Sequence, residues 1–337
     1  MRRSILSCLA TFAFTICAVA ASAETTELRI SKQPGLQYLP QLVMEQNRLV
    51  EKHAKRLGIE NLKVSWILLN SGGTAVDALL SGNIDMVGSG ISNMLVAWSG
   101  TKGQIKGIAP LAALPMWVVT KNPAVNSLKD FTASDKIAVP TIRVSMQSTI
   151  MDIAADKLYG QNDLHHFDPF TVALGHPDAV IALQSGSGSV DAHFSSLPYQ
   201  QYEVKIPGVH VVANSYDILG GPHDSTAVFT TTKFHDENPK VYAAFLAALK
   251  EADEIINREH RNAALIYLQQ SREKWSLSDV VAMLDDKKVI YTMTPLRTMA
   301  FADIMYRAGT IKSKAESWKD YFFPNPVIPS LSRDSGS

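Results

Sequence analysis

Cysteine is nearly absent from this sequence of 337 residues. Its two cysteines, Cys8 and Cys17, both lie in the first 23 residues. The rest of the chain therefore offers no disulfide, no thiolate metal ligand and no cysteine nucleophile. Short enzyme signatures are also missing, because there is no Gly-x-Ser-x-Gly elbow, no phosphate-loop lysine motif and no His-Glu-x-x-His sequence. We expect no catalytic residue, no metal ligand and no cofactor.

An excess of positive charge is missing as well. The chain has 32 basic and 32 acidic residues, and two of the basic ones are Arg2 and Arg3. These arginines precede an apolar run at 5–19, which is short for a membrane span, and the small residues 21–23. We predict a signal peptide at 1–23 and a periplasmic protein; the alternative is an uncleaved anchor helix. Without Arg2 and Arg3 the net charge is about −2, which disfavours a nucleic-acid partner.

A duplicated pattern is present. The stretch "ALLSGNIDM" at 78–86 resembles "ALQSGSGSVDAH" at 182–193. In each stretch a helix is expected to end at a glycine, Gly82 or Gly186, because glycine readily takes the left-handed conformation. A strand is expected to follow at once. Two such helix–strand units, far apart in the chain, predict two similar α/β lobes.

Apolar periodicity predicts a βαβαβ unit in each lobe. The first has strands at 27–31, 62–69 and 84–88, with helices at 39–57 and 74–80. The second has strands at 136–140, 169–173 and from 190, with helices at 150–158 and 177–183. Three helices follow, at 239–257, from 276 and at 295–309, and we expect them to pack on the first lobe. The predicted domains are 24–113 with 226–325, then 114–225, with a tail at 326–337.

In open α/β sheets, ligands bind outside the carboxyl ends of the strands. That rule selects six loops as candidate ligand contacts, and they are rich in Gly, Ser, Thr, Gln and aromatic residues. The loops are 33–38, 71–74, 89–93, 141–148, 175–177 and 194–199.

Two of these loops precede helices and can direct backbone N–H groups at an anion. They contain Ser71 to Thr74 and Ser145 to Ser148, and the alternative is that both are ordinary helix caps. Arg143 is the one full positive charge in the six loops. Its guanidinium suits a sulfonate or carboxylate, unless it is simply a solvated loop residue.

Aromatic and histidine side chains complete the predicted site. Tyr38, Phe194, Tyr199 and, less convincingly, Trp98 could wall a pocket. His193 and His223 could donate to a ligand or could be core histidines. The predicted ligand-binding residues are Gln33, Gln37, Tyr38, Ser71, Gly72, Gly73, Thr74, Ser89, Ser92, Asn93, Arg143, Ser145, Gln147, His193, Phe194 and His223.

Two further features are interpreted as structural. Asp85 and Asp191 occupy equivalent places in the two units, so we expect them to cap the turns before their strands. His165 and His166 are adjacent, which is not a metal-ligand spacing, and we expect both on the surface.

The order of several segments resembles the solute-binding proteins of nitrate, sulfonate and taurine import, a group that includes thiamine-pyrimidine binding proteins. These segments are "LRISKQPG", "NSGGTAVDALLSGNIDMVGSG", "SLKDFTASDKIAVP", "AVIALQSGSGSVDAHF" and "FHDENPKVYAAFLAALKEA". The resemblance implies a type II periplasmic binding fold. In that fold two α/β lobes with mainly parallel sheets are joined by two crossing strands, here near 114–118 and 224–228.

The resemblance also implies a function. Such a protein, expected to be a monomer, closes on a small organic anion and delivers it to a membrane permease driven by an ATPase. Sulfonate-binding relatives often have a tryptophan-rich segment where this chain has His193 to Ser196, which leaves the choice of ligand open. Two alternatives remain: an enzyme similar to the thiamine-pyrimidine synthases, which use a cysteine-rich motif, and a periplasmic sensor subunit.

Overall fold

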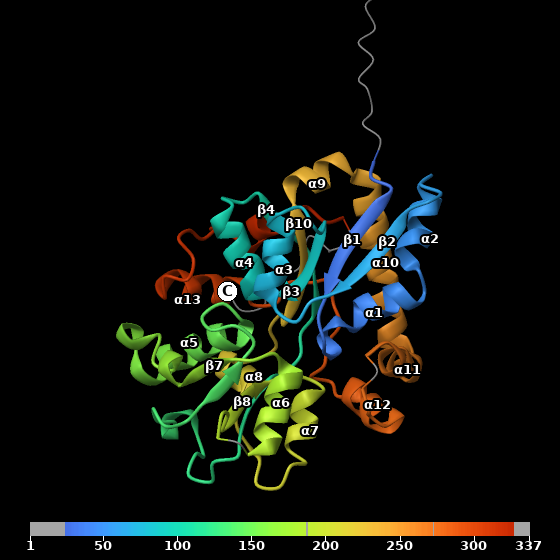
Figure 1. Cartoon of the computed structure of the whole chain (residues 1–337). Coiled ribbons are helices and arrows are strands. Elements are labelled where there is room, and N and C mark those ends of the chain that lie inside the picture. Colours follow the sequence, from blue (N-terminus) through green and yellow to red (C-terminus); the bar gives the residue numbers. More distant parts are fainter. Residues whose placement is uncertain (1–23, 187, 272, 327–337) are drawn as a thin grey trace, which may run out of the picture.

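The computed structural model describes residues 24–326 except 187 and 272. The predicted signal peptide at 1–23 and residues 327–337 of the predicted tail lie outside the described residues. The described chain forms two sheets of five strands each, covered by helices (Figure 1).

The first sheet has the strand order β2-β1-β3-β10-β4. Strand β1 pairs in parallel with β2 and β3, whereas β10 is antiparallel to β3 and β4. Four helices connect its strands. The strands are β1 (Glu27–Lys32), β2 (Lys63–Leu68), β3 (Met86–Gly90), β4 (Ile105–Ala112) and β10 (Thr226–Thr231), and the helices are α1 (Leu39–Gln46), α2 (Leu49–Arg56), α3 (Gly72–Leu80) and α4 (Ile91–Gly100).

The second sheet repeats this topology in the order β7-β6-β8-β5-β9. Strand β6 is parallel to β7 and β8, and β5 is antiparallel to β8 and β9. The predicted α/β fold with a doubled unit is therefore confirmed, but each sheet is mixed. The elements are β5 (Trp117–Thr120), β6 (Ile137–Val139), β7 (Thr171–Ala173), β8 (Ala192–Ser195), β9 (His210–Asn214), α5 (Met146–Tyr159), α6 (His176–Ser185), α7 (Tyr199–Glu203) and α8 (Ser215–Leu219).

The antiparallel strand of each sheet is the one that receives the chain from the other sheet. The chain leaves the first sheet after β4, enters the second at β5, and returns from β9 to β10. The crossings are residues 113–116 and 215–225. We use the predicted domain limits as definitions: lobe 1 is 24–113 with 226–325, and lobe 2 is 114–225.

In the described part of the chain five α-helices follow β10, where three were predicted. Helices α10 and α11 pack against α1 of lobe 1, whereas α13 contacts both α4 of lobe 1 and α5 of lobe 2 (Figure 1). These helices therefore do pack on lobe 1, as expected, but α13 also contacts lobe 2. The helices are α9 (Thr232–Glu237), α10 (Pro239–Arg258), α11 (His260–Ser271), α12 (Leu277–Asp285) and α13 (Thr298–Arg307).

Left-handed residues account for two errors in the predicted helices. The helix expected at 39–57 is divided into α1 and α2 by Arg48, whose φ of 50° cannot continue a helix. The helix expected from 295 begins at Thr298, after Arg297 with a φ of 60°. Neither arginine carries a sequence signal for this conformation, which favours glycine.

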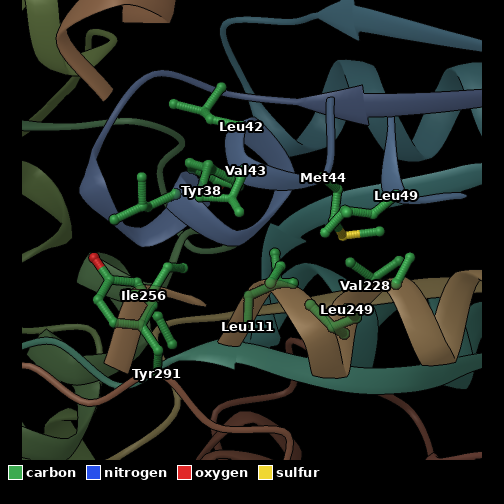
Figure 2. Packing of buried hydrophobic residues seen from close by; sticks show 14 of the residues in the cluster. Tyr38, Leu42, Val43, Met44, Leu49, Leu111, Val228, Leu249, Ile256 and Tyr291 are labelled. Atoms are coloured by element: carbon green, nitrogen blue, oxygen red, sulfur yellow. The ribbon is translucent and has the colours of Figure 1, made fainter. Parts of the chain in front are cut away.

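The described apolar side chains form three cores: one centred on lobe 1, another that spans the lobes, and a smaller one in lobe 2. In lobe 1, Leu111 and Val228 of the sheet pack with Leu249 of α10 (Figure 2). The second core joins Met94 of α4 to Ile150 of α5, and also includes Phe301 of α13. The two lobes are thus in apolar contact along the α4–α5–α13 side.

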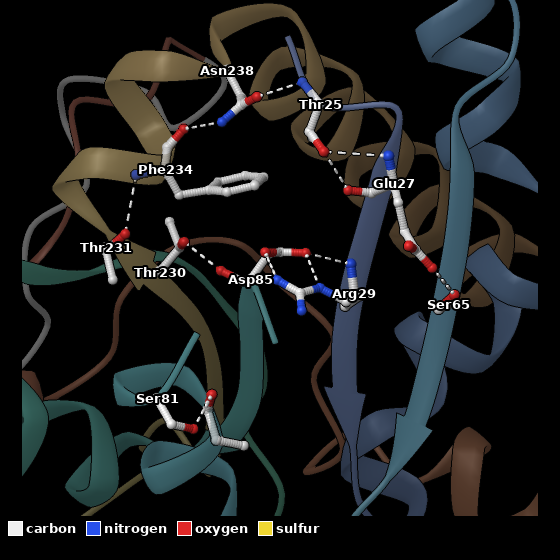
Figure 3. Close-up of polar contacts among 11 residues, drawn as sticks. Thr25, Glu27, Arg29, Ser65, Ser81, Asp85, Thr230, Thr231, Phe234 and Asn238 are labelled. Atoms are coloured by element: carbon white, nitrogen blue, oxygen red, sulfur yellow. Dashed lines mark hydrogen bonds and ion pairs between the residues drawn. The ribbon is translucent and has the colours of Figure 1, made fainter. Parts of the chain in front are cut away.

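The aspartates of the repeated unit tie strands together. In lobe 1 the Asp85 carboxylate accepts the Arg29 backbone N–H at 2.8 Å and its guanidinium at 2.6 and 3.0 Å (Figure 3). In lobe 2 the Asp191 carboxylate accepts the Lys136 backbone N–H at 3.0 Å. In return, the Asp85 backbone N–H donates to the Arg29 carbonyl, and the Asp191 backbone N–H donates to the Lys136 carbonyl. These aspartates join neighbouring strand starts, which corrects the expected turn-capping role.

Candidate functional site

A pocket lies between the two lobes, at the carboxyl ends of the strands that the sequence selected. It encloses a cavity of about 110 Å³, bounded by loops of both lobes and by both crossings. This is far more room than a single water molecule needs, so the space suits a small-molecule ligand. The lining residues are Gln33, Pro34, Gln37, Tyr38, Asn70, Gly72, Ser89, Gly90, Asn93, Met116, Pro140, Thr141, Ser145, Met146, Gln147, Gly175, His176, Pro177, Asp178, Ser225 and Thr226.

Four helices begin at this pocket, two from each lobe. Gly72 starts α3, Gly90 precedes α4, Ser145 precedes α5 and Gly175 precedes α6. The Ser71 and Ser145 hydroxyls accept the N–H groups of Thr74 and Ser148, each at 3.3 Å, so both are helix caps as the alternative interpretation proposed. The N-termini of α4 and α6 have no side-chain cap. Uncapped backbone N–H groups and four positive dipole ends make the pocket attractive to negative charge.

Lobe 1 contributes a polar wall centred on Ser89. The Ser89 hydroxyl oxygen accepts hydrogen bonds from the Gln33 side chain at 3.1 Å and the Asn93 side chain at 3.0 Å. Because the Ser89 oxygen accepts both of these bonds, its own O–H is left to donate to a ligand. The carbonyl oxygens of the Asn93 and Gln37 side chains are buried and have no hydrogen-bond partner. This wall can therefore both donate to and accept from a polar ligand.

Lobe 2 contributes a buried chain of hydrogen bonds that ends at the pocket. The Glu203 carboxylate lies 2.6 Å from His193 Nδ1, and His193 Nε2 lies 2.8 Å from His176 Nδ1. His176 Nε2 in turn lies 3.2 Å from Gln147 Nε2. Burial, aided by the nearby His193, holds the pKa of His176 well below its usual value. A neutral His176 accepts from Gln147 and donates to His193, so this chain fixes how Gln147 faces the pocket.

This chain corrects the roles predicted for His193 and Phe194. His193 is fully buried and lies behind His176, which lines the pocket in its place. Phe194 is fully buried in the core that spans the lobes. Side chains alternate along β8, so the two point to opposite faces of the sheet, where each is fully buried, and neither lines the cavity. Tyr199 stacks on His176 with ring centroids 5.7 Å apart, and Trp98 donates to the Asp320 carbonyl, so neither forms a pocket wall.

His223 belongs to the crossings and does not line the pocket. Its Nδ1–H donates to the Asp224 carbonyl at 3.0 Å, so Nε2 accepts from the Ser215 hydroxyl at 2.9 Å. The same hydroxyl accepts the Met116 backbone N–H at 3.0 Å. His223 thereby links the two crossings. Burial lowers its pKa to about 4, so the ring is neutral at pH 7.

Arg143 lies outside the pocket. Its side chain is 62% exposed and its Nε donates to Asp168 at 2.5 Å. Its backbone is left-handed, with a φ of 65°, and the residue is not part of the pocket lining. Among the described lining residues there is no lysine or arginine, and Asp178 at the exposed rim is the one acid.

The predicted residues therefore divide into two groups. One group lines the pocket: Gln33, Gln37, Tyr38, Gly72, Ser89, Asn93, Ser145 and Gln147. The other does not: Ser71, Gly73, Thr74, Ser92, Arg143, His193, Phe194 and His223. Ser71 and Thr74 bond to each other, and Ser92 bonds to the Met146 sulfur at 3.1 Å.

Sequence reasoning missed His176, Met146 and Asn70. His176 and Met146 lie in loops that the sequence selected, but neither residue type stood out there. Asn70 lies one residue before the selected loop at 71–74. The crossing residues Met116, Ser225 and Thr226 carry no local signal, because they reach the pocket only through the arrangement of the two lobes.

The profile of the NMT1-like family matches residues 21–268. The chain belongs to the NMT1-like family. A search of curated proteins finds no match. None of the described helices has the length and apolar character needed to cross a membrane.

Solved structures with the same fold are distant in sequence. The alkanesulfonate-binding protein SsuA of Xanthomonas axonopodis pv. citri, bound to MOPS, has 19% identity and a TM-score of 0.68, over 87% of this chain and 96% of that one. The aliphatic sulphonate-binding protein SsuA of Escherichia coli has 18% identity and a TM-score of 0.65, over 89% and 93%. The nitrate-binding protein NrtA of Synechocystis PCC 6803 has 14% identity and a TM-score of 0.68, over 87% and 84%. This family member has the periplasmic-binding-protein fold.

Proposed function

We propose that this protein is the solute-binding component of an ABC importer outside the cytoplasm, that it binds a small organic monoanion between its lobes, and that it delivers the anion to a membrane permease. The observation that carries the proposal is the pocket between the lobes, where four helix N-termini meet. Family membership and the sulfonate- and nitrate-binding proteins of the same fold support it.

The chemistry of the lining supports an organic monoanion. Backbone N–H groups at helix N-termini and neutral side chains can stabilise a delocalised anionic charge such as that of a sulfonate without arginine or lysine, and a single charge demands least of such a lining. The Tyr38, Met116 and Met146 side chains supply apolar surface for an organic group. The cavity of about 110 Å³ is larger than an inorganic ion such as nitrate requires.

The enzyme alternative receives less support from the site. The pocket lining contains no cysteine, and His176, the ring nearest the ligand space, hydrogen-bonds at both nitrogens. The sensor alternative uses the same pocket and differs only in the membrane partner.

Native mass spectrometry of the protein purified from its own periplasm tests the proposal. We expect one small anion bound per chain, recovered chemically unchanged after incubation. Turnover of that compound would favour the enzyme, and a bound cation or peptide would contradict the proposal.

A further inference from the structure

A second polar cluster lies where lobe 2 meets the end of α13, and none of its residues lines the pocket. Asp152 comes from α5, His165 from a turn that follows this helix, and Asp168 from the first position of the short 3-10 helix at 168–170. His165 Nδ1 is 3.5 Å from Asp152 Oδ1 and 3.4 Å from Asp168 Oδ2. One donor atom from each of the three residues lies within 4.8 Å of the others.

The hydrogen bonds around His165 fix the state of its ring. Its Nε2 lies 2.8 Å from the Ala308 carbonyl oxygen, so Nε2 carries a hydrogen and donates. In the neutral ring Nδ1 is then a lone pair, and it faces two carboxylates. His165 Nδ1 is buried without a hydrogen-bond partner, and so is Oδ2 of Asp152, a residue only 3% exposed. Two carboxylates and this lone pair therefore face one another, and of the three groups Asp168 alone has a cation of the described chain beside it, Arg143.

The distances favour a metal ion over a proton. A proton on Nδ1 would draw one carboxylate to about 2.7–2.9 Å, the usual length of a charge-assisted bond. A tetrahedral ion with ligands at about 2.1 Å holds them about 3.4 Å apart. The two separations from His165 Nδ1, 3.4 and 3.5 Å, match the second arrangement, and the two carboxylate oxygens lie within 4.8 Å of each other.

Partners outside the cluster resemble those of metal sites. A ligating histidine usually donates its other ring N–H to a carbonyl or carboxylate, as His165 does to Ala308. Ligating carboxylates are usually hydrogen-bonded in turn, as Asp168 is to Arg143 Nε at 2.5 Å.

We propose that Asp152, His165 and Asp168 bind a divalent transition metal of the zinc class, with water as the remaining ligand. One imidazole and two carboxylates suit zinc better than magnesium, which prefers oxygen ligands alone. Ala308 directly follows α13, and Arg307 of α13 pairs with Asp156 of α5 at 2.7 and 2.8 Å. The metal therefore braces α5 of lobe 2 against the C-terminal helix. None of the three residues lines the pocket between the lobes.

Zinc titration of the chelator-treated protein by calorimetry tests this proposal. We expect one zinc per chain, weak magnesium binding, and the visible absorption of a tetrahedral ion when cobalt is used. Asp152→Asn and His165→Gln should each weaken zinc binding at least tenfold. His166→Gln is the matched control, because His166 pairs with Asp163 at 2.7 Å and stacks on Tyr159 outside the cluster.

Thermal melts without metal show whether each variant folds. If a variant does not fold, the zinc stoichiometry and the cobalt spectrum of the unmodified chain still test whether the site exists. Failure of that chain to bind zinc at one equivalent would overturn the proposal. Equal losses in the His165 and His166 variants would also overturn it, since that result indicates adventitious surface binding.

Discussion

At the residue scale, the polar wall of lobe 1 depends on the absence of a side chain at Gly72. A Cβ at this position would lie 2.2 Å from Asn93 Nδ2 and 2.3 Å from Ser89 Oγ. Gly72→Ala must therefore displace both groups, and we expect ligand affinity to fall roughly ten- to hundredfold, the effect of losing about 1.5–3 kcal/mol.

Gly73→Ala is the matched control for this prediction. A Cβ added at Gly73 would meet no atom within 4 Å, and the residue lies in the first turn of α3. Calorimetry on both variants measures the difference. Equal affinities in the two variants would show that the Ser89–Asn93 wall does not contact the ligand.

His223 gives the molecule a predicted sensitivity to acid. Its pKa is about 4 in the folded protein against 6.5 when exposed, chiefly because of burial. Between these values the unfolded chain binds more protons, so the free energy of unfolding is greatest above pH 6.5 and falls as the pH drops toward 4. The loss is on the order of 3 kcal/mol.

Thermal melts between pH 4 and pH 8 measure this loss. His223→Asn should have a lower melting temperature at pH 7, because it breaks the bonds between the crossings, and a smaller further decrease toward pH 4. Part of the decrease in melting temperature that remains in this variant comes from His176, whose pKa is also lowered by burial. A wild-type melting temperature that does not change from pH 7 to pH 4 would contradict the account.

At the element scale, the sequence predicted the strands and helices of the repeated unit because most of them have a local signal, and it missed β5 and β9. Gly186 caps the C-terminus of α6 and Gly82 follows the C-cap of α3, with left-handed φ values of 63° and 73°. The polar contacts were less predictable. Glu203, the partner of His193, lies ten residues further along the chain in a separate helix, and Arg143 pairs with Asp168 outside the pocket. Both contacts depend on packing between elements, which no local sequence pattern records.

Helix α13 contacts both lobes, and we expect this contact to restrain movement between them. Arg307 pairs with Asp156 across the two lobes, whereas Lys314 pairs with Asp303 within the C-terminal segment. Because partly exposed ion pairs contribute about 1 kcal/mol or less, Arg307→Ala should speed ligand release by less than about tenfold.

Stopped-flow release and small-angle scattering measure the effect of Arg307→Ala. The ligand-free variant should be more extended than the wild type, while Lys314→Ala should match the wild type in both measurements. An unchanged radius of gyration together with an unchanged release rate would show that α13 does not hold the lobes together.

At the scale of the whole molecule, two similar lobes meet around a pocket that carries no lysine or arginine among its described lining residues. Gly90 of lobe 1 lies so close to lobe 2 that an added Cβ would be 2.9 Å from Met146 Cγ. The lobes are thus in contact at the pocket, and the N-termini of all four helices can act on one bound group. The central claim is that these helix ends, and not a charged side chain, hold an organic anion.

Calorimetry in Tris buffer, which contains no sulfonate, tests this claim most directly, with propanesulfonate and the uncharged methyl propyl sulfone as paired ligands. The account predicts that the sulfonate binds at least tenfold more tightly than the sulfone. It also predicts that Arg143→Ala binds the sulfonate within about twofold of the wild type, since tenfold corresponds to 1.4 kcal/mol and Arg143 lies outside the pocket. Equal binding of the two ligands, no binding of either, or loss of sulfonate binding in Arg143→Ala would contradict it.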